Sequence, residues 1–438
     1  MFSVALLWSG YVCLAQSVTP PSSRPDLAPL ADKLPSAPSL VAATEPQPIT
    51  LEQAVAMAER ASPRIRGAKA ALERALAVAR ASRAYTNPVV EVYEGQQYAR
   101  PIATPGVPGL LQHYAAYQTI EVPRERRARH RAAESAAEGV RFGQAAIQRS
   151  VTANARQAFY NVLRRREEVE HTQENLTLVE DLRRRVEVEV RVGEKGRLEL
   201  TRAEAETARA RFAVRSARLE LANSIALLRV AIAAPADANL EPQGALAARV
   251  TLPSLAELRA IVLQTHPNVS QSEANIQQAG AVLDRERALR IPQPTTFVEF
   301  ENQPDLRFWR TGISIPLPLW DRRQGQIGEA KSAISQSIAE LDQRKLELIS
   351  STERAYEQYQ LADEQALSLE SGELRAAESA VQGAQAAYRF GERGIVEVLD
   401  AQRVLQGVRG DLLDAQFARQ SALIDLQELG ALTPEGKP

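Results

Sequence analysis

Two acidic residues in the C-terminal part of the chain have the type and spacing to act on cations. Glu397 and Asp400 lie three residues apart in a stretch with a helical pattern. Residues at this spacing share one face of a helix. Two carboxylates held together attract positive charge. The chemistry that this pair indicates is therefore electrostatic.

The segment that carries this pair occurs twice. Residues 193–203 read GEKGRLELTRA, and residues 391–401 read GERGIVEVLDA. In the first copy Glu199 matches the glutamate, whereas Arg202 replaces the aspartate. A repeat at this separation indicates that a whole structural unit has been copied once. We expect the two halves at 50–240 and 251–432.

No arrangement of residues in the sequence indicates catalysis. There is no Ser/His/Asp order, no phosphate-binding glycine loop and no carboxylate pair in a plausible cleft. The single cysteine, Cys13, excludes an intrachain disulfide and a zinc site of the CxxC type. The histidines are scattered without ligand spacing: His113, His130, His171 and His266. We therefore expect neither an enzyme nor a bound metal or cofactor.

The composition fits long helices better than compact globular domains. The chain has 438 residues, a formal net charge of -1 and only 5% aromatic residues. A near-neutral balance of charge gives no support for nucleic-acid binding. Alanine is abundant in the helical regions, which suits close packing of helices over long distances.

The N-terminal residues are expected to direct export. Residues 1–15 are apolar, too short to span a bilayer, and resemble a signal peptide. The basic start of a signal peptide is missing, so a misassigned start codon is an open alternative. Lipidation of Cys13 is another, which Val12 disfavours because it is large for the position before a lipidated cysteine. Residues 16–48 are rich in Pro, Ser and Ala and predict an extended tether. No other apolar run is long enough to predict a transmembrane helix.

Each half is expected to open with an interrupted helix. Thr50 is placed to cap the first helix, and Pro63 should bend or break it. Ser254 and Pro267 take the same places in the second half. This agreement supports the duplication.

Two pairs of strands are expected after the opening helices, at 89–98, 114–122, 295–302 and 308–317. In the last strand an apolar face, with Trp309 and Ile313, alternates with a more polar face, with Arg310. This pattern suits a strand between lipid and a watery lumen, and it equally suits any half-buried sheet. Aromatic residues crowd all four segments, which favours girdles at a membrane interface. The alternative is a small sheet with an ordinary aromatic core.

Very long helices should follow each pair of strands. One is expected near 124–191 and the other near 322–389, and neither contains a proline. Each would be roughly 100 Å long at about 1.5 Å per residue. Each ends at the repeated glycine turn, and shorter helices return at 197–232 and 395–430. A short tail at 433–438 completes the chain. Helices of this length suit a structure that bridges a wide compartment.

The order of helix, strand pair, long helix, glycine turn and helix occurs in both halves. It resembles the order found in the TolC-like outer-membrane factor family. The most specific segment is YRFGERGIVEVLDA at 388–401, and SIPLPLWDRRQG at 314–325 is similar to the heavy-metal, CzcC-like branch. The resemblance covers roughly 50–432. It implies a mainly α fold with a small β part, in which duplicated helical hairpins form a trimeric α-barrel. Four transmembrane strands per protomer would complete a twelve-stranded barrel.

The resemblance also implies roles for individual residues. A periplasmic gate, at the closed end of the duct, would involve Glu199, Tyr388, Arg393, Glu397 and Asp400. The two turns would dock a periplasmic adaptor through Val192, Gly193, Glu194, Phe390, Gly391 and Glu392. Without the resemblance, all of these are solvated helix ends and chain reversals, since glycine alone explains a turn.

The function that follows is an exit duct in the outer membrane, extending into the periplasm. Its partners would be two further copies of itself, the adaptor, an inner-membrane transporter of the RND type and outer-membrane lipid. The CzcC-like segment favours export of heavy-metal cations. Export of drugs or organic solvents is the alternative, and a type I secretion duct or a periplasmic coiled-coil adaptor is less well supported.

Overall fold

The described part of the computed structural model comprises residues 47–98, 108–246 and 249–433. The signal peptide expected at 1–15 and most of the tether expected at 16–48 lie outside these residues. The end of the expected tether belongs to the fold instead. Gln47–Ile49 forms strand β1, which pairs in parallel with β4 (Leu240–Pro242).

The two halves repeat one order of helices and strands. The first contains α2 (Leu51–Ala61), α3 (Pro63–Ala81), β2 (Val89–Gln97), β3 (Gly109–Thr119), α4 (Pro123–Arg191) and α5 (Arg197–Ala231). The second contains α6 (Leu255–Thr265), α7 (Pro267–Ala288), β5 (Thr295–Asn302), β6 (Arg307–Ser314), α8 (Gln324–Ser368), the π-helical turn η1 (Leu369–Glu373), α9 (Leu374–Arg389) and α10 (Ile395–Glu428). The fold is thus mainly helical, with a small β part.

The helix breaks follow from the local sequence. Thr50 and Ser254 each form a capping box. The cap side chain accepts from the N–H of the third helical residue, and the side chain of that residue accepts from the N–H of the cap. Pro63 and Pro267 then begin the next helix, at a position where no intrahelical N–H donor is needed.

The four longer strands form one antiparallel sheet in the order β2-β3-β5-β6. Its second strand begins at Gly109 rather than at residue 114, because Gly109–His113 continue the ladder opposite Tyr93–Gln97. The strand expected at 308–317 is also shorter in the structure, where β6 ends at Ser314. The ladder ends at Ser314, since Pro316 has no N–H to donate.

The long helix of the second half also differs from the expected 322–389. Whereas α4 is continuous, η1 separates α8 from α9. A π-helical turn is a wider turn that usually interrupts the regular ladder at one place. Gly372 lies in this turn, and a Cβ added there would meet nothing within 4 Å.

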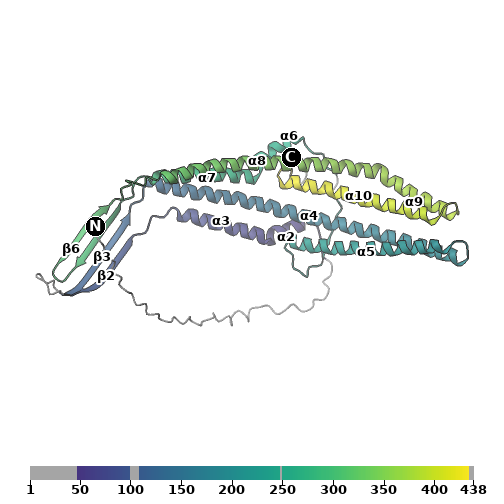
Figure 1. Cartoon of the computed structure of the whole chain (residues 1–438), viewed down its shortest axis with the longest axis horizontal. Helices are drawn as coiled ribbons and strands as arrows, with labels where there is room; N and C mark the ends of the chain where they lie inside the picture. Colours follow the sequence, from purple (N-terminus) through teal and green to yellow (C-terminus); the bar gives the residue numbers. More distant parts are fainter. Residues whose placement is uncertain (1–46, 99–107, 247–248, 434–438) are drawn as a thin grey trace, which may run out of the picture. The chain divides into compact units, whose positions relative to one another are not determined.

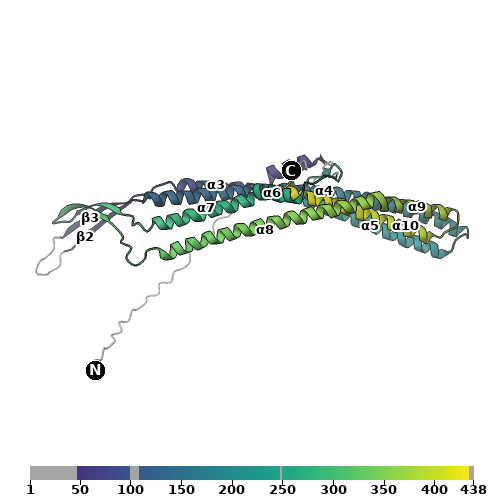
Figure 2. The same ribbon diagram turned by 90° about the horizontal axis from the view of Figure 1, so that it is seen from above.

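Within residues 47–433, the sheet and the two glycine turns lie at opposite ends (Figures 1 and 2). Next to the sheet, the packing order is α3, α4, α7 and α8; towards the turns it is α5, α4, α10 and α9. The main apolar clusters form between these regions, where α2 packs on α4 and α6 packs on α8. Phe159 and Leu258 are among their fully buried side chains.

Candidate functional site

The two glycine turns have the same geometry. Gly193 and Gly391 adopt φ values of 84° and 74°, which glycine tolerates without steric cost. In each turn the next residue donates its N–H back to a helix carbonyl: Glu194 to Glu189 and Glu392 to Ala387, both at 2.9 Å. This pattern is a Schellman motif, which satisfies carbonyls at a helix end. The repeated segment therefore encodes a sharp reversal.

Apolar side chains stand exposed beside both turns. Val192 is 65% exposed and Phe390 is 81% exposed. Among the described residues, a Cβ at either turn glycine would meet nothing within 4 Å, so there is open space beside both glycines. The six residues expected to dock a partner thus lie at the two turns, with their apolar members open to contact.

Tyr388 joins the two helical hairpins just before the second turn. Its side chain is buried among Val186, Ile395 and Leu399, and its hydroxyl donates to Glu189 Oε2 at 2.5 Å. Glu189 belongs to α4, in the other half of the chain. Burial, reinforced by the hydrogen bond to this carboxylate, raises the pKa of Tyr388. The phenol therefore stays protonated and can donate across the hairpins.

Glu199 lies close to this contact on α5. Its Oε2 atom is buried without a hydrogen-bond partner among the described residues. The negative charge of Glu199 adds to the effects that raise the pKa of Tyr388. Lys195 Nζ lies over the ring of Tyr388, 5.5 Å from its centre. The structure thus brings Glu199 and Tyr388 into one electrostatic environment.

Arg393 lies just before α10, and Glu397 and Asp400 lie in its first two turns. All three side chains are exposed. Arg393 Nη1 is 3.9 Å from Glu397 Oε1, an ion pair within one turn of chain. Asp400 Oδ1 accepts from Arg403 Nη1 at 3.1 Å. Between them, Val398 is buried in the core. Among the described residues, Tyr388 is the one expected gate residue that hydrogen-bonds to the other hairpin.

The two hairpins are also joined by residues that the sequence analysis does not single out. Arg403 also donates to Glu206 at 2.6 Å, and Arg409 donates to Glu174 at 3.1 Å. Neither these residues nor Glu189 fall in a motif, and their partners lie about two hundred positions away in the chain. No spacing rule within one half could have predicted these pairs.

The sheet has one apolar and one charged face. Rows of residues paired across the strands place these apolar side chains on one face: Val90, Val92, Leu110, Tyr114, Val298, Phe300, Trp309 and Ile313. All of them are exposed, Trp309 by 72% and Ile313 by 63%. On this face charges occur only at the end away from the helices, at Glu94 and Arg307.

The opposite face holds the remaining charges of the sheet. Glu91, Glu299 and Arg310 occupy one row across it. Glu299 accepts from Tyr117 at 3.0 Å and also from Arg310. An exposed apolar face backed by a hydrogen-bonded polar face is the arrangement of a sheet between lipid and a watery lumen.

Two features are absent from the described residues. No three His, Cys, Asp or Glu side chains in the described ranges come together in a way that could hold a metal ion. No helix in the part of the chain that the structure describes is long and apolar enough to cross a membrane.

Comparison with known proteins agrees with this geometry. Residues 258–431 match the model of the family described as outer membrane efflux protein. The cobalt-zinc-cadmium resistance protein CzcC of Cupriavidus metallidurans is 25% identical over 288 residues, which are 65% of this chain and 69% of CzcC. The family description and this name concern efflux and resistance, and neither names an enzyme.

Solved structures share the fold along most of the chain. A crystal structure of CusC, described with transmembrane channel formation, has a TM-score of 0.75 at 19% identity, covering 86% of this chain and 91% of CusC. The outer membrane channel CmeC of Campylobacter jejuni has a TM-score of 0.76 at 15% identity, covering 86% and 85%. The chain therefore resembles the TolC-like outer-membrane efflux factors, and among them the heavy-metal, CzcC-like branch.

Proposed function

We propose that three copies of this chain form one efflux duct, whose sheets join into a twelve-stranded barrel in the outer membrane. Similarity to outer-membrane efflux proteins supports a location in that membrane, extending into the periplasm. The observation that carries the proposal is the four-stranded sheet, which has an exposed apolar face and two unpaired edges, β2 and β6.

The edges explain why one copy is not enough. Unpaired N–H and C=O groups in lipid each cost several kcal/mol, so only closed sheets span a membrane. Four strands are too few to close around a lumen, since even the smallest membrane barrels have about eight. With β2 and β6 antiparallel at the edges, successive copies can continue the antiparallel order. Three copies match the assembly that the family resemblance implies.

The turns are proposed as the docking site for a periplasmic adaptor. Val192 and Phe390 offer exposed apolar surface at the end of the helices away from the sheet. An inner-membrane transporter would drive export through this adaptor, since the sequence holds no nucleotide-binding loop. The same end would close the duct, with Tyr388 and Glu189 holding the hairpins together.

Heavy-metal cations are the proposed cargo. The name of CzcC supports this choice, and so does the charged face of the sheet, where Glu91, Glu299 and Glu301 outnumber Arg310. Carboxylates that line a pore favour cations. Drugs or organic solvents are the alternative cargo, because a duct need not bind what passes through it.

Two measurements test this function. A strain that lacks the protein should become sensitive to cobalt, zinc and cadmium, and the intact gene should restore resistance. In detergent, the protein should have the native mass of three chains and form cation-preferring channels in planar bilayers. Sensitivity only to drugs would favour the alternative cargo. A single-chain native mass, or fractionation with the cytosol, would contradict the duct.

A further inference from the structure

A cavity between the two halves of the chain contains basic side chains that lack partners. It has a volume of about 450 Å³ and is lined by residues of α4, α6, α10 and the segment that follows α10. α4 belongs to the first half, and the other elements belong to the second. Arg149 and Arg156, about two turns apart on α4, bring positive charge to this cavity.

Both guanidinium groups are partly buried without a hydrogen-bond partner. Nη1 of Arg149 and Nε of Arg156 make no hydrogen bond to a described residue. Elsewhere, Arg149 Nη2 donates to the carbonyl of Thr265 at 3.4 Å, and Arg156 Nη1 donates to Gln427 Oε1 at 2.6 Å. Neither arginine forms an ion pair with a described carboxylate. Burial without a partner is unfavourable for a charged donor, and it lowers the pKa of both arginines.

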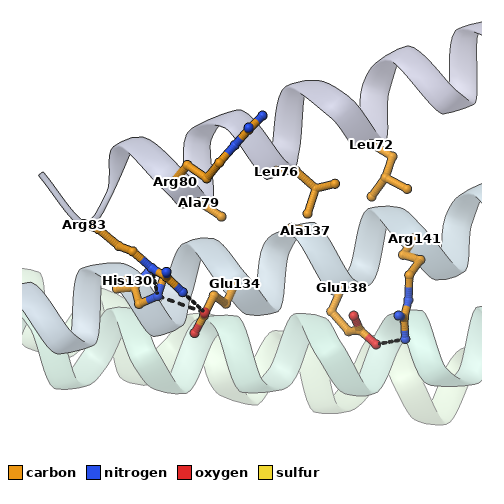
Figure 3. Close-up of a pocket in the computed structure, with 10 residues that line it drawn as sticks. All are labelled: Leu72, Leu76, Ala79, Arg80, Arg83, His130, Glu134, Ala137, Glu138 and Arg141. Carbon is orange, nitrogen blue, oxygen red and sulfur yellow. Dashed lines mark hydrogen bonds and ion pairs between the residues drawn. The ribbon is translucent and has the colours of Figure 1, made fainter.

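A larger groove between α3 and α4 shows the contrasting case of arginines that have partners (Figure 3). There Arg83 donates to His130 at 2.8 Å, and Arg141 donates to Glu138 at 2.5 Å. The two arginines of the smaller cavity have no such contacts. The smaller cavity is therefore the place where a counter-charge is missing from the described residues.

The remaining side chains leave the smaller cavity with a net positive charge. Glu428 is the one carboxylate among the described residues that line it, against two guanidinium groups. The hydroxyls of Thr152 and Thr265 donate to carbonyls of their own helices, at 2.8 and 2.9 Å. Since these hydrogens are already used, the arginines supply the donors that a bound group would meet.

Two neighbours of Arg149 show that its position is open and its charge is not neutralised. Gly430 has a φ of 76°, and a Cβ there would collide with Nη1 of Arg149. The pKa of His266 is lowered to about 4 by burial, and further by the charges of Arg149 and Arg344. A guanidinium that a carboxylate had neutralised would repel a second positive charge far less.

We propose that the smaller cavity binds an anionic oxygen group, a phosphate or a carboxylate, which Arg149 and Arg156 hold. The planar guanidinium group forms paired hydrogen bonds to either of these groups. Partial burial strengthens the attraction, because less water screens the charges. The bound anion joins α4 to the end of α10, beside the contact of Arg156 with Gln427. The site lies within one chain, so it does not depend on the proposed assembly.

Titration calorimetry of the purified protein in detergent, with inorganic phosphate at constant ionic strength, tests the site. The parent should bind phosphate. Arg149→Gln and Arg156→Gln should each weaken this binding roughly tenfold or more, because each removes a charged donor. The matched control is Arg141→Gln, which removes the same charge from an arginine of α4 that pairs with Glu138, and it should bind like the parent. A parallel titration with acetate distinguishes a phosphate site from a carboxylate site.

Glu428→Gln gives a measurement that misfolding cannot imitate. It removes the one acidic group that lines the cavity, so phosphate should bind more tightly than to the parent. The assignment is overturned if the parent binds neither anion, or if both arginine variants bind like the parent. It is also overturned if Glu428→Gln binds no more tightly, since the anion would then lie away from this carboxylate. A single-chain native mass would contradict the duct and leave this site standing.

Discussion

At the scale of single residues, the contact between Tyr388 and Glu189 is the most specific feature near the turns. It is the hydrogen bond that a buried side chain makes from one hairpin to a carboxylate of the other. Hydrogen bonds to charged groups contribute about 1.5–3 kcal/mol, more than the exposed ion pairs around it. If this end of the duct opens, this bond must break.

Tyr388→Phe should therefore favour the open form. The substitution removes the hydroxyl and keeps the ring in its apolar cluster. Only the closed form loses a hydrogen bond, so only the closed form is destabilised. A loss of about 1.4 kcal/mol would change the closed-to-open ratio roughly tenfold. Single-channel recordings would show this as more frequent or larger openings.

The matched control is Tyr356→Phe, which removes a hydroxyl that accepts an exposed hydrogen bond from Gln360 at 3.0 Å within α8. This variant should conduct like the parent. Equal conductance in all three proteins would show that the Tyr388 hydroxyl does not hold the duct closed.

At the scale of elements, glycines in the strands have different roles. Gly312 of β6 lies opposite Phe297 of β5, and the phenylalanine ring covers it closely. A Cβ on Gly312 would come within 2.5 Å of the ring, whereas a Cβ on Gly95 in β2 would meet nothing within 4 Å. The Phe297 ring also packs beside Tyr117, with 6.1 Å between the ring centroids.

Gly312→Ala should lower the melting temperature of the folded protein, because overpacking costs about 1–3 kcal/mol. Gly95→Ala should not lower it by a comparable amount. Loss of the folded, heat-sensitive band on a detergent gel with rising temperature measures both. A Gly312→Ala protein that melts with the parent would mean that the ring does not pack over this strand.

The sequence predicts a feature well when that feature depends on residues close together in the chain. Thr50 and Ser254 cap their helices and the turn glycines adopt positive φ, because these features depend on a few neighbouring residues. The start of β3 was missed, since it depends on pairing with β2. The partner of Tyr388 was missed because Glu189 lies in the other half. The expected gate and docking roles come from the family resemblance, whereas the pairing of β3 with β2 and of Tyr388 with Glu189 comes from the fold.

At the scale of the whole molecule, symmetry would change the meaning of the charges near the turns. In one chain, Glu397 and Asp400 each have an arginine nearby, at 3.9 and 3.1 Å. Exposed pairs of this kind contribute little to stability. Around a threefold axis they would become six carboxylates and six guanidinium groups, so the local charge seen by an ion depends on which groups face the lumen.

Replacing Glu397 and Asp400 together with alanine tests whether the carboxylates face inwards. We expect block of the single-channel current by divalent cations to weaken roughly tenfold, about 1.4 kcal/mol in binding free energy. The control removes the same charge from exposed positions on α8, with Glu357→Ala and Glu364→Ala, and should leave the block intact. If the first double variant is blocked like the parent, its carboxylates point away from the lumen and Arg393 and Arg403 screen them. If both double variants lose block equally, the effect comes from net charge and these two residues have no special position in the duct.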